Sequence, residues 1–185
     1  IPAGSFSVSG HAVDIGMVLR SFGLGDSVLG LADGTFRVTG KGTTWQVARD
    51  SLAMTAHVED ASFLISTPQS ENDIQLNLHK GHLSMAGSAA GELVLAGRYG
   101  QRPFRVRATT GSLSDFFSNR RWPIRVAVHG GRSSLTVDGV IDRPLKGEGV
   151  ALTLQGDAPR LNEWAPSLPA VGPFRLSGNL TGHTP

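Results

Sequence analysis

Only a few residues of this chain have the types and the spacing that chemistry requires, and His79 and His82 come nearest to a metal-binding pair. Lys80 and Gly81 separate the two histidines, a pattern typical of a hairpin tip, where two imidazoles can approach one metal ion. The neighbouring sequence offers no evident third ligand. We therefore predict a surface turn at this position and no metal site.

Two pairs of acidic residues have the composition of a general acid–base site. Glu59 adjoins Asp60, and Glu71 lies two residues before Asp73. Both pairs fall in segments with turn signals, where carboxylates are normally solvated. Residues 40–43 (GKGT) fail as a phosphate-binding loop because glycine follows the lysine, and the chain contains no G-x-S-x-G motif. We accordingly expect no enzyme activity and no cofactor.

Arginines recur between apolar neighbours, which indicates a charged face. The five are Arg37, Arg105, Arg107, Arg125 and Arg175. A ladder of guanidinium groups would suit anionic lipid headgroups or an acidic protein partner. The same residues would equally form a solvated outer face whose charges discourage pairing at sheet edges, and the sequence leaves both interpretations open. The densest basic cluster, Arg120-Arg121 beside Trp122, is too small to indicate nucleic-acid binding, and the formal net charge is only +2.

The elements that must position these side chains are strands in which apolar and polar residues alternate, with the sequence apolar-Arg-apolar at the centre. Four versions are Phe36-Arg37-Val38, Phe104-Arg105-Val106, Ile124-Arg125-Val126 and Phe174-Arg175-Leu176. Successive side chains of a strand point to opposite faces, so the apolar residues share one face and the arginines the other. Short helices with bulky apolar residues accompany these strands at 15–22, 113–117 and 161–164. A recurring unit of this kind indicates an elongated structure built from degenerate repeats, with approximate boundaries at 1–42, 43–120 and 121–185.

Further strands are predicted from the same alternation and from the glycines between them. The expected strands cover residues 6–9, 35–39, 53–58, 61–66, 74–78, 83–86, 93–99, 104–108, 124–129, 134–141, 150–154 and 174–180. Thr43 followed by Gln46 predicts one more capped helix, up to Leu52, and Ser112 with Asp115 predicts the cap of the helix at 113–117. The predicted fold is all-β with short helices, a mainly antiparallel, elongated and twisted sheet or groove within one β-rich segment.

Composition agrees with many short strands and excludes several classes of protein. The chain has 185 residues, with 24 glycines, 10 prolines and 17% charged residues, which is turn-rich without being typical of disorder. It has no cysteine, and therefore no disulfide and no thiolate metal site. No apolar run approaches the roughly 20 residues needed to span a bilayer, and the N-terminus lacks the pattern of a signal peptide. Because the chain opens at Ile1 without methionine, we expect a piece of a longer protein.

The C-terminal half carries a series of short motifs in a definite order. They are residues 93–100 (LVLAGRYG), 103–106 (PFRV) followed by 111–113 (GSL), 135–139 (LTVDG) followed by 149–154 (GVALTL), and 161–164 (LNEW) followed by 172–178 (GPFRLSG). In this order and spacing, the stretch from Gly91 to Gly182 resembles the AsmA-like family of bacterial envelope proteins. The joint at 34–42, a strand between glycines that leads into a capped helix, is also similar to that family.

The resemblance implies a periplasmic segment of a protein that is anchored in the inner membrane by a part this chain lacks. Such proteins form long β grooves with apolar interiors and are implicated in phospholipid transport between the envelope membranes or in outer-membrane homeostasis. On that interpretation, apolar strand residues contact phospholipid acyl chains. The candidates are Phe36, Val38, Phe104, Val106, Ile124, Val126, Phe174 and Leu176.

Two alternatives stay open at this point. The same apolar faces would equally suit the core of a closed sandwich, because alternation identifies an apolar face but not what covers it. The chain could also be a structural or assembly module that binds envelope proteins through its sheet edges and carries no lipid.

Overall fold

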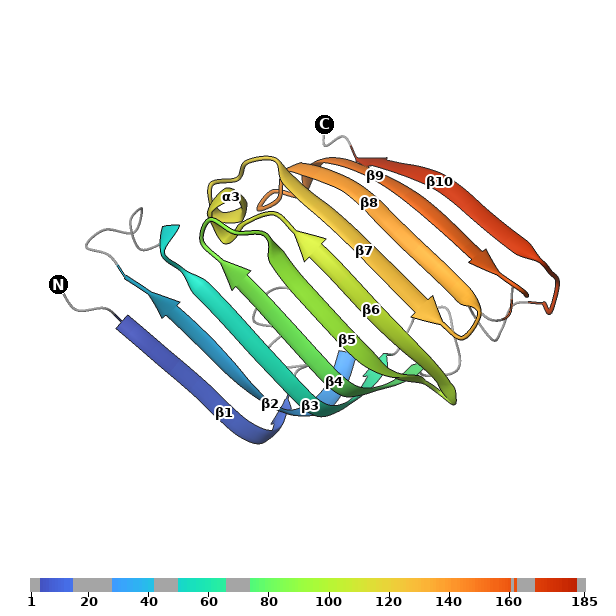
Figure 1. Ribbon diagram of the computed structural model, residues 1–185, viewed down its shortest axis with the longest axis horizontal. Helices are drawn as coiled ribbons and strands as arrows, with labels where there is room; N and C mark the ends of the chain where they lie inside the picture. The colour runs from blue at the N-terminus through green and yellow to red at the C-terminus, as the bar shows by residue number, and fades with distance from the viewer. Residues whose placement is uncertain are drawn as a thin grey trace.

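The protein is one continuous antiparallel sheet in the computed structural model, which describes residues 4–14, 28–41, 50–65, 74–160, 162 and 169–182. Within those residues, ten strands pair in the order of the sequence, from β1 at one edge to β10 at the other (Figure 1). The strands are β1 (Gly4–Asp14), β2 (Val28–Gly40), β3 (Ala53–Ile65), β4 (Ile74–Ala86), β5 (Gly91–Tyr99), β6 (Arg102–Thr110), β7 (Trp122–Gly130), β8 (Ser133–Arg143), β9 (Glu148–Ala158) and β10 (Phe174–Gly182). The prediction of an all-β, mainly antiparallel sheet is confirmed.

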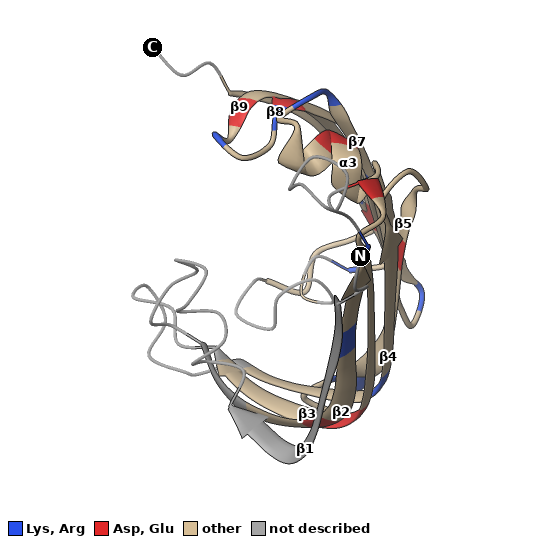
Figure 2. Ribbon diagram, turned by 90° about the vertical axis from the view of Figure 1, so that its left-hand side faces the viewer, with Lys and Arg blue, Asp and Glu red and all other residues tan. Residues whose placement is uncertain are grey.

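The sheet is open and strongly curved. Figure 2 shows the strands from β2 to β9 bent into an arc. The strand order places β1 and β10 at separate edges of the sheet. Each strand has a right-handed twist about its own axis, so neighbouring strands are rotated relative to one another. This rotation accumulates across a wide sheet and favours such curling. The curved sheet therefore has a concave and a convex face.

The breaks that the sequence predicted within β3 and β4 are wrong. Residues 53–65 and 74–86 are each one strand, so Glu59-Asp60 lies inside β3, and His79 and His82 lie inside β4 instead of at a hairpin tip. The turn signals mark irregularities of pairing. The register shifts between Asp33 and Gly34 where β2 meets β3, and between Leu78 and Lys80 where β4 meets β5, as an extra residue in a β-bulge would require.

Gly81, which contributed to the predicted turn, serves close packing inside β4. It is buried, and a Cβ atom added there would lie 3.2 Å from Cβ of Val58 and 3.0 Å from Cδ2 of Leu95. A glycine within a strand commonly marks such a close approach of neighbouring chains. Gly81 thus allows close packing inside a strand, whereas its local sequence suggests a turn.

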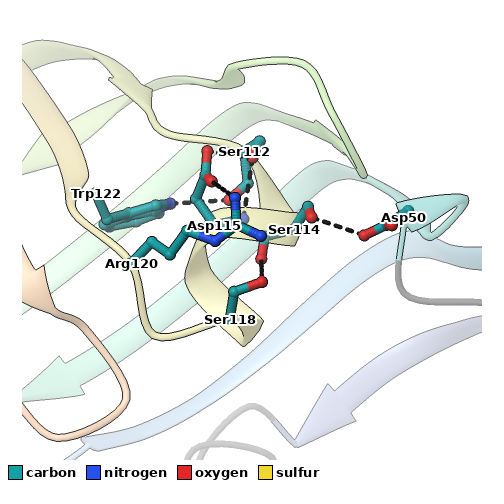
Figure 3. Close-up of polar contacts among 7 residues, drawn as sticks. All are labelled: Asp50, Ser112, Ser114, Asp115, Ser118, Arg120 and Trp122. Carbon is teal, nitrogen blue, oxygen red and sulfur yellow. Dashed lines mark hydrogen bonds and ion pairs between the residues drawn. The ribbon is translucent and has the colours of Figure 1, made fainter. Parts of the chain in front are cut away.

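The short helix α3 (Leu113–Phe117) is capped as the sequence predicts. The backbone N–H of Asp115 donates to Oγ of Ser112 at 3.1 Å, and the Ser112 hydroxyl donates to Oδ2 of Asp115 at 2.7 Å (Figure 3). Trp122 Nε1 donates to the Ser112 carbonyl at 3.2 Å, and the Ser114 hydroxyl donates to Oδ1 of Asp50 at 2.8 Å. Leu113 is buried. These bonds join α3 to the start of β7 and to the segment that leads into β3.

Replacing Ser112 by alanine is expected to lower the free energy of unfolding by about 1 kcal/mol, because the cap of α3 is lost and the amide of Asp115 is left without its acceptor. Urea denaturation measures the change. Ser177→Ala, at an exposed position of β10, serves as the matched control and should stay within about 0.5 kcal/mol of the parent. Equal midpoints for the two variants would show that the cap contributes nothing.

Several expected helices fall on residues outside the described set. The helix at 15–22 lies wholly outside it, and those at 43–52 and 161–164 lie largely outside it. Among the residues that the structure describes, none belongs to a helix long and apolar enough to cross a membrane.

Candidate functional site: the apolar concave face

The strand register gathers apolar residues onto one face of the sheet. One cross-strand row is Phe36, Ala56, Leu83, Leu93, Ala108, Val126, Val137 and Leu154, and a parallel row is Val58, Gly81, Leu95, Val106, Val128 and Leu135. Leu78 and Gly81 are an odd number of residues apart and would point to opposite faces of a regular strand. The register shift between Leu78 and Lys80 places both on the same face, so the apolar pattern continues. A continuous apolar face therefore extends from β2 to β9.

This apolar face is the concave one. The ring of Phe116, in α3, lies 5.3 Å from the ring of Trp122, and Trp122 pairs with Ile141 in the same alternation as Val126 and Val137. Figure 2 shows α3 on the inner side of the arc. The helix thus packs at one end of the strands, on the apolar side, and the opposite face is convex.

A hollow of about 540 Å³ lies on the concave face, towards the strand ends opposite α3. Its lining is Leu76, Tyr99, Arg102, Pro103, Phe104, Val106, Val128, Gly130, Gly131, Ser133, Ser134 and Leu135. Gly130 helps to make room for it, because this residue lines the hollow, pairs with Phe104 and adds no side chain to the face. The guanidinium of Arg102 lies at this hollow and donates to the carbonyl of Asn162 at 2.8 Å.

All eight residues named from the sequence lie on this face, but the structure does not bring them together. Phe104 and Val106 line the hollow. Ile124 and Val126 are nearer to α3, whereas the pairs in β2 and β10 are separated from one another by strands β3 to β9. Leu76, Val128 and Leu135 were missed as candidates. The alternation in Val126-Ala127-Val128 and in Leu135-Thr136-Val137 is the signal that could have found the last two.

The described residues form a single layer. The buried apolar residues among them are Ala32, Ala61, Leu78, Ala108, Leu113 and Ala158. None of the described side chains is less than 2% exposed, and Phe36 and Leu176 on the concave face are each 37% exposed. A second sheet packed on this face would bury its leucines, valines and phenylalanines completely. A closed sandwich is therefore not the arrangement of the residues that the structure describes.

The arginines predicted to share a face lie on the convex side and are exposed, but they do not form a ladder. Arg105 pairs with Ala96 and His129, and Arg107 pairs with Val94 and Ala127, so that arginine does not lie beside arginine across the strands. This spacing favours the interpretation of a solvated outer face.

Acidic partners also occur on the convex face. Nε of Arg125 donates to Oδ1 of Asp138 at 2.7 Å. That hydrogen bond, together with the negative charge of Asp138, raises the pKa of Arg125 above its usual value. Both side chains are exposed, so the pair contributes little to stability.

The structure gives the histidines other partners than the sequence suggested. His82 faces His57 across β3 and β4, and His79 lies 3.8 Å from a carboxylate oxygen of Asp60. Within the described residues, three or more side chains of the metal-ligating types do not gather anywhere. Glu71 and Asp73 lie outside those residues.

Comparison with known proteins gives no match. A scan against models of protein families, a search of curated proteins and a search of solved structures each found none. The AsmA-like resemblance therefore stays a prediction from the sequence motifs.

Proposed function

We propose that this chain is a periplasmic segment of an AsmA-like protein anchored in the inner membrane, and that its concave face shelters phospholipid acyl chains during transport between the inner and outer membranes. The observation that carries the proposal is the hollow of about 540 Å³ on an apolar, single-layered face. Its size lies within the range of about 300–1,000 Å³ that is typical of small-molecule sites.

The chemistry of the face suits hydrocarbon. The hollow has leucine, valine and phenylalanine along the strands, and an acyl chain laid there would leave no hydrogen-bonding group unsatisfied. Each methylene group transferred from water to such a surface contributes about 0.8 kcal/mol. The polar groups of Tyr99 and Arg102 at the hollow can stay hydrated or contact the more polar end of the ligand.

Native mass spectrometry of the chain, purified gently from bacterial membranes, tests the proposal. We expect a stoichiometric adduct of one or more phospholipids, which solvent extraction and lipid mass spectrometry identify. A clean mass of the unliganded chain under the same conditions would contradict lipid carriage.

A second function, a structural or assembly module, is favoured by the edge strand β10. Residues 175–181 of this strand are exposed, including Leu176 and Leu180, and its backbone pairs with β9 on one side. An exposed edge of this kind can accept a strand from a partner protein. Cross-linking in whole envelopes, from a photoreactive residue placed at Asn179, would then capture an envelope protein while the purified chain carries no lipid.

A further inference from the structure

A pair of histidines on the convex face has the geometry of a chelate. His57 in β3 and His82 in β4 are direct cross-strand partners, although 25 residues separate them in the sequence. Their ring centroids are 4.6 Å apart at an interplanar angle of 42°, and their Nδ1 atoms are 3.3 Å apart. The two Nδ1 atoms are therefore nearer to each other than the ring centres are, so each ring has this nitrogen on the side of its partner.

The distance between the two nitrogens is informative. Two imidazole nitrogens that each lie about 2.05 Å from a tetrahedral zinc ion are about 3.3 Å apart. Imidazole is a good ligand for Zn²⁺, Ni²⁺ and Cu²⁺, and water can complete a coordination sphere at a surface. His57 is exposed and His82 is half-buried, so an ion can reach the pair from solvent.

The sheet holds the two ligands in place. Val58 and Gly81, the residues next to His57 and His82, are themselves register partners on the concave face, where Gly81 is closely packed. The backbone positions of the histidines are thus set before any ion binds, which reduces the entropy that binding must overcome.

We propose that His57 and His82 form a two-histidine site for a divalent transition-metal ion, bound through both Nδ1 atoms. The site is on the face opposite the apolar hollow and does not depend on the proposed lipid binding. The alternative is a simple hydrogen bond, in which one Nδ1 donates to the other at the same distance.

The test is a zinc titration of the full chain labelled with ¹⁵N, followed by the histidine side-chain resonances. We expect the Nδ1 signals of His57 and His82 to shift together and to saturate at one equivalent of Zn²⁺. No shift of either signal up to millimolar zinc would overturn the proposal and leave the hydrogen bond alone.

Variants assign the binding to this pair. His57→Gln and His82→Gln should each weaken zinc binding at least tenfold in isothermal titration calorimetry. His79→Gln and His129→Gln, at two other exposed histidines of the strands, are the matched controls and should bind as the parent does. If binding instead follows His79 or His129, or persists unchanged in both pair variants, the proposed site is wrong. Thermal unfolding without metal checks that each variant is folded, and the resonance titration of the parent chain needs no variant.

Discussion

Replacing Val106 by glutamate is expected to weaken the binding of a fluorescent phospholipid analogue at least a hundredfold while the chain stays folded. Val106 lies in the hollow, midway along β6, and is half-buried. In the unliganded protein, a carboxylate there is open to water. An acyl chain that covers it removes that water, at a cost of several kcal/mol, and each 1.4 kcal/mol corresponds to about a factor of ten in affinity.

The matched control is Val94→Glu. Val94 is in the neighbouring strand β5 but on the convex face, where it is 39% exposed and pairs with Arg107. This variant has the same change of residue type and of charge, and it should bind the lipid analogue as the parent does. If both variants bind equally well, acyl chains do not lie in the hollow; if both lose binding, the effect arises from charge or misfolding.

Replacing Gly97 by alanine is expected to lower the free energy of unfolding by about 2 to 3 kcal/mol, the largest stability change that we predict. Gly97 is buried in β5, between Leu78 and Phe104 of the neighbouring strands. A Cβ atom there would clash with the carbonyl oxygen of Asn77 and would lie 3.0 Å from Cζ of Phe104. Neither the strand backbone nor the aromatic ring can move without disturbing the packing around Leu78, so the strain is retained.

Gly178→Ala is the control for this prediction. Gly178 is in β10, and a Cβ atom added there meets no atom within 4 Å. Because alanine restricts the unfolded chain more than glycine does, this variant should be neutral or stabilising by up to about 1 kcal/mol. Urea denaturation of both variants measures the difference. A loss of stability at Gly178 equal to that at Gly97 would show that the glycines matter for their backbone freedom and not for space.

Local sequence predicted most strands, and the reason is the period of two. Phe104-Arg105-Val106 alternates between an apolar and a charged residue, and the structure places Phe104 and Val106 on the concave face and Arg105 on the convex one. The cap of α3 could also be predicted from the local sequence, because Ser112 and Asp115, which form it, are only three positions apart. The alternation and the cap each involve residues only two or three positions apart, so both can be recognised without knowing how the rest of the chain folds.

The errors arose where a local signal had a non-local cause. Glu59-Asp60 in β3 and Gly81 in β4 have the composition of turns, but the first lies beside a shift of register and the second beside the side chains of Val58 and Leu95. For the same reason, the histidine pair was assigned to His79 and His82. The actual partner of His82 is His57, which only the pairing of β3 with β4 brings near.

The sequence by itself determined that the chain forms antiparallel strands, which residues share a face, and that one face is apolar. Only the tertiary structure decided that this face is the inner side of a curved, open sheet, that its hollow lies between Leu76 and Leu135, and that the described residues place no second layer over it. The physical reason is that alternation along one strand specifies the direction of each side chain. The curvature of the sheet, the space in its hollow and the cover over its face depend on the register of many strands together. The space in the hollow also depends on Gly130, which adds no side chain there.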